Sequence, residues 1–297
     1  MRTCTKAIAA VLVGGAAVLA GAATFSAEPS GVVRLTRDGL FKQRPAWSPD
    51  GKQLCFARHE GDAIRLFVMD VEGGGQRRLT DRKHPEYDAV WSPDSKRLAL
   101  SLVNVSGTQG DVDVYTVSAD GSDFQQVAGS QGGLSHEESA CFSPDGTQIA
   151  FTSTRDGNQE LYVAAADGSN VRRLTNDLGI DAHPAWSPDA ARIAFATDRW
   201  GDLEIATVDP EGMNLTRLTT SEGLDDYPAW SPDGKRLAFT SNRDRNYEIY
   251  AVDSTGAIAV NLTNDPAFDH FAAWSHDGRL AFVSDRDGGF EIYVLEK

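Results

Sequence analysis

The stretch Pro228-Ala229-Trp230-Ser231-Pro232-Asp233-Gly234-Lys235-Arg236-Leu237-Ala238-Phe239 decides how this 297-residue chain folds, because it recurs six times with small changes. The aromatic position of the six copies is held in turn by Trp47, Trp91, Phe142, Trp186, Trp230 and Trp274. Successive copies are therefore 44, 51, 44, 44 and 44 residues apart. A fixed period of roughly 40–45 residues is typical of the blades of a β-propeller.

Each copy is predicted to form a hairpin between two buried strands. In Ser231-Pro232-Asp233-Gly234 the proline presets one backbone dihedral and the glycine accepts a positive φ, so the chain turns tightly. We label the strand that ends at the aromatic residue a, and the apolar strand after the turn b. Two further segments of each repeat, c (for example residues 248–253) and d (172–175), have the β-branched and aromatic content of strands. Each repeat is therefore predicted to form four strands.

The two ends of the repeat region predict a closed ring. Residues 32–36 form a d segment with no a, b or c before it, and residues 290–294 form a c segment with no d after it. The segments match in number only if the first strand completes the last blade, which also leaves no open sheet edge. We therefore predict an all-β fold, a single six-bladed β-propeller of four-stranded antiparallel blades over residues 28–297.

Residues 1–27 stand outside the repeats and are typical of a secretory signal peptide. Arg2 and Lys6 give a positive start, and an apolar run rich in alanine and glycine follows over residues 7–23. We expect the protein to be exported, to the periplasm or outside the cell, and not to span a membrane. An uncleaved anchor is the alternative.

The charge of the chain limits its partners. The net charge of −15 becomes −17 when the leader is removed, because the leader contains Arg2 and Lys6 and no acid. Such a chain repels nucleic acid and anionic membranes, and it favours cations or basic segments of other proteins.

The second repeat is longer than the others by seven residues. Four of them fall in the b–c link near residues 104–110, and three fall in the d–a link near residues 128–138. Both kinds of link emerge on the same face of an antiparallel blade, and such loops carry function when a rigid scaffold holds them. Neutral variation in loop length is the alternative.

The repeats resemble those of the TolB-type six-bladed β-propeller. The resemblance covers residues 32–297 and rests on the six Trp/Phe-Ser-Pro/His-Asp motifs, the Arg-Leu-Thr segments, and the Ser/Thr-x-Arg-Asp-Gly…Glu-Ile-Tyr pattern at 152–162 and 284–293. It implies an envelope protein, because TolB is a periplasmic member of the Tol–Pal system whose propeller docks a lipoprotein. TolB also carries an α/β domain before the propeller, and we expect this chain to lack one. Similar blades occur in prolyl oligopeptidase-type peptidases and oligogalacturonate lyases, but no Gly-x-Ser-x-Gly elbow of a peptidase is present.

Charged residues recur five positions before each aromatic residue: Lys42, Glu86, Glu137, Asp181, Asp225 and Asp269. Because strand a lines the channel of a propeller, we expect these side chains to converge at one mouth and to create a negative potential there. Three interpretations are open. The ring binds a protein partner, such as an envelope lipoprotein or a basic segment; it has a structural role, with carboxylates that cap turns or pair with arginine; or it binds a cation such as Ca²⁺ through hard oxygen ligands.

Two further features lie in the b–c links. Arginine recurs at Arg155, Arg199, Arg243 and Arg286, and we interpret it as a tie between the link and its own blade. Trp200 lies outside the repeated pattern, and we predict that it is exposed on the same rim as the acidic mouth. An exposed aromatic residue among polar neighbours is a candidate for a binding hot spot.

We therefore predict an exported, monomeric, non-catalytic module that binds protein, without catalytic residues or a cofactor. Its predicted contact residues are Glu86, Glu137, Asp181, Asp225, Asp269 and Trp200. The alternative is a metal-dependent lyase or hydrolase of an acidic polysaccharide that works in the channel. The predicted negative mouth, which repels such a substrate, and the scattered histidines disfavour this alternative.

Overall fold

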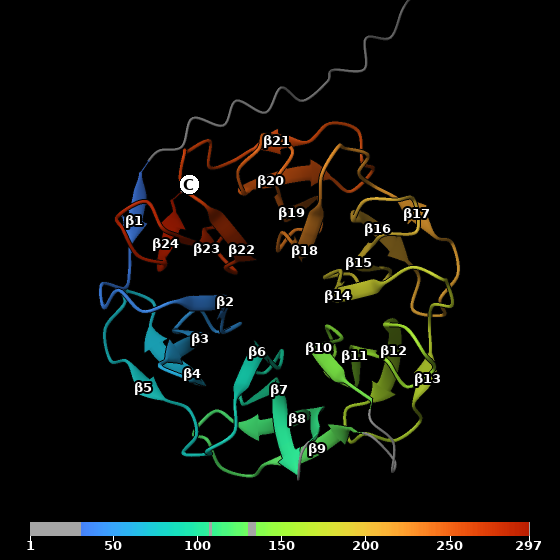
Figure 1. Ribbon diagram of the computed structural model, residues 1–297, viewed down its shortest axis with the longest axis horizontal. Helices are drawn as coiled ribbons and strands as arrows, with labels where there is room; N and C mark the ends of the chain where they lie inside the picture. The colour runs from blue at the N-terminus through green and yellow to red at the C-terminus, as the bar shows by residue number, and fades with distance from the viewer. Residues whose placement is uncertain (1–30, 107–108, 130–134, 297) are drawn as a thin grey trace, which may run out of the picture.

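The computed structural model describes residues 31–106, 109–129 and 135–296, and in this part of the chain six four-stranded antiparallel sheets surround a central channel (Figure 1). The predicted six-bladed propeller is confirmed. The predicted leader, residues 1–27, lies outside the described residues. No helix in the described ranges is long and apolar enough to cross a membrane.

The sheets are numbered as blades 1 to 6 along the chain, and the strands of each blade are given from the channel outward. Blade 1 is β2 (Lys42–Trp47), β3 (Gln53–Glu60), β4 (Ala63–Asp70) and β5 (Arg77–Arg78), and blade 2 is β6 (Glu86–Trp91), β7 (Arg97–Ser106), β8 (Gln109–Ser118) and β9 (Gln125–Ala128). Blade 3 is β10 (Glu137–Phe142), β11 (Gln148–Ser153), β12 (Glu160–Ala165) and β13 (Arg172–Arg173), and blade 4 is β14 (Asp181–Trp186), β15 (Ile193–Thr197), β16 (Glu204–Val208) and β17 (Thr216–Arg217). Blade 5 is β18 (Asp225–Trp230), β19 (Arg236–Ser241), β20 (Glu248–Asp253) and β21 (Val260–Asn261), and blade 6 is β22 (Asp269–Trp274), β23 (Leu280–Ser284), β24 (Glu291–Leu295) and β1 (Val32–Arg34).

The first strand of the described chain closes the ring, as predicted. Strand β1 pairs antiparallel with β24, with Val33 opposite Val294, and Figure 1 shows the two side by side at the outer edge of blade 6. The Leu35 amide continues the pairing by donating to the Ile292 carbonyl at 2.8 Å. The outer edge of the last blade is therefore covered by the beginning of the chain.

A hydrogen-bonded turn joins strands a and b in every blade. In blade 5 the Ser231 hydroxyl donates to Asp233 Oδ1 at 2.7 Å and accepts from the Arg236 amide at 2.9 Å, while Gly234 adopts a φ of 68°. The Ser–Asp bond recurs at Ser48–Asp50, Ser92–Asp94, Ser143–Asp145, Ser187–Asp189 and Ser275–Asp277. In each case this serine lowers the pKa of its aspartate below the ordinary value. We call this end of the ring the hairpin face, and the opposite end, where the b–c and d–a links lie, the link face.

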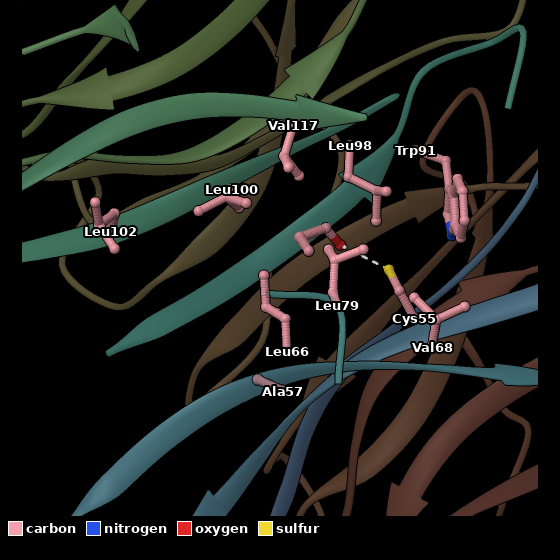
Figure 2. Close-up of a cluster of buried hydrophobic side chains, with 11 residues drawn as sticks. Cys55, Ala57, Leu66, Val68, Leu79, Trp91, Leu98, Leu100, Leu102 and Val117 are labelled. Atoms are coloured by element: carbon pink, nitrogen blue, oxygen red, sulfur yellow. Dashed lines mark hydrogen bonds between the residues drawn. The ribbon is translucent and has the colours of Figure 1, made fainter. Parts of the chain in front are cut away.

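The core consists of apolar clusters between neighbouring blades. Figure 2 shows one of them, in which Leu98 and Leu100 of blade 2 pack against Cys55 and Val68 of blade 1. The Trp91 ring belongs to the same cluster, and its Nε1 donates to the Ala46 carbonyl of blade 1 at 3.1 Å. Burial of each large apolar side chain contributes about 1.5–3 kcal/mol. The repeated aromatic residues therefore join adjacent blades.

Of the seven additional residues of repeat two, the four in the b–c link lengthen its middle hairpin, and the other three lie in the d–a link. Strands β7 and β8 contain 10 residues each, whereas their counterparts in blade 4 contain 5. The lengthened hairpin ends on the link face, as predicted. Residues 107–108 and 130–134 of the two enlarged links lie outside the described ranges.

Candidate functional site

The recurrent acidic residues are buried inside the blades rather than exposed at a channel mouth. Glu86, Glu137, Asp181, Asp225 and Asp269 have 0% relative exposure. The expectation of an open, negatively charged mouth is therefore wrong. Whether these residues take part in partner binding stays a prediction, and any such part is indirect in this conformation.

Arginine from the b–c link covers each acid in blades 3 to 6. Arg199 Nη2 donates to both oxygens of Asp181, at 2.9 and 2.7 Å, and Arg286 makes the same paired contact with Asp269. Arg243 lies 2.7 Å from Asp225, and Arg155 lies 3.3 Å from Glu137. The predicted tie between each b–c link and its own blade is confirmed, and it neutralises the carboxylates. Burial nevertheless raises the pKa of Asp269, to about 6.

In blades 1 and 2 the charged residue five positions before the aromatic residue is held by other contacts. The Glu86 carboxylate accepts from the Thr80 hydroxyl at 2.5 Å, and burial raises its pKa. Lys42 is also fully buried, and its Nζ lies 2.7 Å from Glu291 Oε2 in blade 6. The charge of Lys42 thus helps to hold the two ends of the ring together.

A second set of buried acids was missed by the sequence interpretation. Strand c begins with glutamate in blades 3 to 6: Glu160, Glu204, Glu248 and Glu291. In blade 4, Glu204 accepts from the Thr219 hydroxyl at 2.6 Å and from Arg217 at 2.8 Å. The sequence shows the Glu-Ile-Tyr motif and the Arg-Leu-Thr segment as two separate repeated motifs. Because the two motifs occur together in successive repeats, a contact between the glutamate and the Arg-Leu-Thr segment could have been predicted. These contacts join strands c and d.

The centre of the channel is filled by side chains from all six a strands. Each strand has a bulge, marked by a shift in the pairing with strand b and by a positive φ three residues before the aromatic position. The residues at this position are Arg44, Asp88, Ser139, His183, Tyr227 and Phe271. We call them the channel plug.

Contacts within the channel plug cross the ring. Arg44 of blade 1 lies 3.2 Å from Asp88 of blade 2, and its guanidinium lies 5.0 Å from the Tyr227 ring centre of blade 5. Tyr227 stacks on His183 with ring centres 4.0 Å apart, and His183 Nδ1 lies 2.6 Å from Asp226 Oδ1. Desolvation raises the pKa of Tyr227, so its hydroxyl stays protonated. The polar groups of the plug are thus largely engaged with one another.

A cavity of about 260 Å³ lies on the hairpin side of the plug. Its walls are mostly alanine, proline and the repeated tryptophans, and the described residues that line it include one histidine and no carboxylate. Cys141 also lines it, but burial raises the pKa of this thiol to about 12, so the thiolate nucleophile is scarce at neutral pH. These lining residues provide neither a set of metal ligands nor an activated nucleophile.

Exposed apolar side chains gather on the link face of blade 4. Leu178 is fully exposed, Ile180 is 43% exposed and Trp200 is 39% exposed. The d–a link that carries Leu178 and Ile180 contacts the b–c link that carries Trp200, because the Ile180 amide donates to Asp198 Oδ1 at 2.6 Å. We call Leu178, Ile180 and Trp200 the apolar patch. The predicted exposure of Trp200 is confirmed.

Arginines hold the Trp200 ring in place. The Arg217 guanidinium lies 4.8 Å from the ring centre, and the Arg199 guanidinium lies 5.7 Å from it. Arg199 is the residue that binds the buried Asp181, so one acid of the ring is linked to the apolar patch through a single side chain. Two more exposed apolar residues, Leu40 and Phe268, lie in other d–a links of the same face.

The chain is similar to known proteins in both sequence and structure. It is 31% identical over 121 residues to the Tol-Pal system protein TolB of Anaeromyxobacter dehalogenans, a match that covers 41% of this chain and 26% of that protein. It is 30% identical over 143 residues to the uncharacterized peptidase YuxL of Bacillus subtilis, which covers 48% of this chain and 20% of that one. These matches thus span about a fifth to a quarter of the length of the curated relatives. A putative TolB from Agrobacterium tumefaciens has the same fold, with a TM-score of 0.69 and 22% identity over 89% of this chain and 96% of that structure.

The family model described as "TolB beta propeller domain" matches residues 36–140, 134–227 and 221–297. These three matches cover nearly all of the propeller, including every a–b hairpin with its aromatic residue and turn. The chain therefore belongs to the TolB β-propeller domain family.

Proposed function

We propose that this protein is a non-catalytic protein-binding module of the bacterial cell envelope. In this proposal residues 1–27 direct its export, and the propeller acts as a monomer in the periplasm or outside the cell. Its partner is a protein, such as an envelope lipoprotein, that docks on the link face. A relative that matches part of the chain is a Tol-Pal system protein, which supports the envelope location.

The observation that carries the proposal is the apolar patch. Leu178, Ile180 and Trp200 expose large apolar surface on two linked loops, and two arginine guanidiniums contact the Trp200 ring. Tryptophan and arginine are the residue types most enriched among the hot spots of protein interfaces. A rigid blade beneath the loops also reduces the entropy lost on binding.

The buried acids support this surface from below. Asp181 orients Arg199, and Arg199 contacts the Trp200 ring. We propose that Glu86, Glu137, Asp181, Asp225 and Asp269 contribute to partner binding in this indirect way, by holding the links in position.

The enzymatic alternative lacks a set of metal ligands among the described residues that line the channel cavity. A metal-dependent lyase or hydrolase needs several ligands that converge on one ion, whereas the cavity wall offers His183 and no carboxylate. The relative named as a peptidase is matched over only 20% of its length. We therefore place the function in binding rather than in catalysis.

The test is a capture experiment from envelope extract of the source bacterium with immobilised protein. The wild type and a Met213→Ser variant are expected to retain the same envelope protein, and a Trp200→Ala/Leu178→Ser variant is expected to lose it. Met213 is the matched control because it is 61% exposed and lies in a c–d link, on the hairpin face. Retention of the partner by the double variant, or its loss from the Met213 variant, would contradict the proposed surface.

A further inference from the structure

The enlarged links of blade 2 bring three carboxylates together at the boundary with blade 3. Asp111 and Asp113 lie on β8, and Glu137 begins β10. One oxygen atom of each side chain lies within 4.8 Å of the other two. The arrangement depends on the enlarged links, because a parallel bridge between Val112 and His136 fixes the d–a link against β8.

Glu137 is a fully buried member of this cluster, and one of its carboxylate oxygens has no partner among the described residues. Its Oε1 accepts from the Ser153 hydroxyl at 2.6 Å and lies 3.3 Å from Arg155. Its Oε2 is buried, and no described residue donates a hydrogen bond to it. A buried carboxylate oxygen without a donor is costly, and the cost is removed when a cation binds it.

Neighbouring side chains hold the carboxylate of Asp113 in place through hydrogen bonds, as the residues around a metal site orient the metal ligands. Amide donors from Asn104 and Gln126 bind Asp113 Oδ2, the latter at 2.9 Å. At Gly129 the chain passes so close that an added Cβ would lie 2.7 Å from Asp113 Oδ1. Such contacts fix the direction of a carboxylate and strengthen its binding to a metal.

We propose that Asp111, Asp113 and Glu137 form a Ca²⁺ site that joins blade 2 to blade 3 on the link face. Carboxylate oxygens are the ligands that Ca²⁺ prefers, at about 2.3–2.6 Å, and two ligands on opposite sides of the ion are then about 4.6–5.2 Å apart. The oxygens of this cluster lie within 4.8 Å of one another, so one ion can reach all three. Among the described residues, Arg155 contacts Glu137, and it does so through Oε1.

The site shares Glu137 with the buried acids that are proposed to hold the links, but it lies apart from the apolar patch. It lies between blades 2 and 3, whereas the apolar patch belongs to blade 4 and the d–a link before it. A bound ion joins β8 to β10, so it stabilises the folded protein and not the unfolded chain.

The experiment is thermal unfolding of the metal-free protein with added CaCl₂ or MgCl₂, together with calorimetric titration. At Ca²⁺ concentrations about 100-fold above Kd, Tm is expected to rise by roughly 5 °C with one ion bound per chain. The conservative variants Asp111→Asn and Glu137→Gln are expected to lose this rise. Glu86→Gln is the matched control, because Glu86 occupies the equivalent buried position in blade 2 and is not one of the three clustered carboxylates, and it is expected to keep the Ca²⁺-dependent rise.

Two outcomes would overturn the proposal. The first is a wild-type Tm that does not respond to millimolar Ca²⁺, or a response that persists in Asp111→Asn. The second is an equal response to Mg²⁺, which would assign the site to divalent cations without preference. Asp111 is only partly buried, so its variant is expected to fold and to keep the test decisive.

Discussion

Arg199 Nη2 lies 2.7 Å from Oδ2 of the fully buried Asp181, and this contact fixes the b–c link of blade 4 onto the first strand of the same blade. The same guanidinium lies 5.7 Å from the exposed Trp200 ring. Arg199, one of the arginines that recur in the b–c links for a structural reason, thus also helps to set the position of Trp200, the candidate hot spot.

Replacing Arg199 with alanine leaves the Asp181 carboxylate buried and without its cation. Breaking a buried ion pair by removing one partner costs about 3–5 kcal/mol, so the free energy of unfolding should fall by an amount of this order. Urea denaturation measures the change. Lys52→Ala is the control, because the Lys52–Asp50 pair is exposed and its loss should change stability by less than about 1 kcal/mol. Equal effects of the two variants would disprove the structural role of the buried pair.

Replacing Thr36 with valine tests the closure of the ring. The Thr36 hydroxyl is buried, donates to Glu291 and accepts from the Ile292 amide at 2.9 Å, so it joins the beginning of the described chain to blade 6. The valine variant leaves Glu291 without this donor and should lose about 1–3 kcal/mol of stability. Thr216→Val, at an exposed position, should be nearly neutral in the same denaturation experiment. An unchanged midpoint for Thr36→Val would argue against a strong closure.

Gly121 illustrates why a glycine with a positive φ recurs in the c–d links. Its φ is 88°, and an added Cβ would overlap the Leu79 carbonyl oxygen at the boundary with blade 1. Gly121→Ala should therefore cost at least about 2 kcal/mol, more than a positive φ alone costs. Gly61→Ala separates the two effects, because Gly61 has a φ of 62° and open space around it. Calorimetric Tm values should be clearly lower for the Gly121 variant, and equal values would remove the steric explanation.

His270 makes the stability of the propeller depend on pH. It packs on Tyr247, with ring centres 4.4 Å apart, and burial lowers its pKa to about 4. The unfolded chain binds a proton at this residue near pH 6.5, so stability should fall as pH drops from about 6.5 to about 4. His270→Gln should remove roughly 1–2 kcal/mol of this dependence, as measured by denaturation at several pH values.

The neighbouring Asp269 changes the pH dependence of stability in the opposite direction. It is present in both the wild type and the His270→Gln variant. Its raised pKa of about 6 means that the folded state takes up a proton before the unfolded state does, so its contribution increases as pH falls. The difference between the two pH profiles therefore isolates His270. Parallel profiles would show that His270 is protonated equally in the folded and unfolded states.

The fold was predictable because its signals repeat. Six Trp/Phe-Ser-Pro/His-Asp motifs set the number of blades, and the d-type segment at Val32–Arg34 together with the c-type segment at the other end predicted the closure that β1 and β24 make. Trp200 was recognisable as exposed because it stands outside the repeat. In each case the informative feature was local in the sequence.

The environment of the acids was less predictable, since burial depends on residues far along the chain. The arginine that covers Asp181 comes 18 residues later. Its recurrence predicted a tie between the link and its blade, but pairing of the acids with arginine was one of three interpretations that the sequence left open. The channel plug was missed because its six members share a positive φ and not a residue type, and Arg44, Tyr227 and Phe271 carry bulky side chains that seldom adopt this backbone conformation. The carboxylates of Asp111, Asp113 and Glu137 come together only through the packing of two blades.

The affinity of the captured partner for the propeller tests the central claim most directly. Calorimetric titration of the purified partner into wild-type protein, Trp200→Ala and Met213→Ser gives three dissociation constants. Loss of a hot-spot tryptophan costs about 2 kcal/mol or more, so Kd should rise at least about 30-fold for Trp200→Ala and less than about 2-fold for Met213→Ser. A Kd for Trp200→Ala equal to that of the wild type would contradict the assignment of the link face as the binding surface.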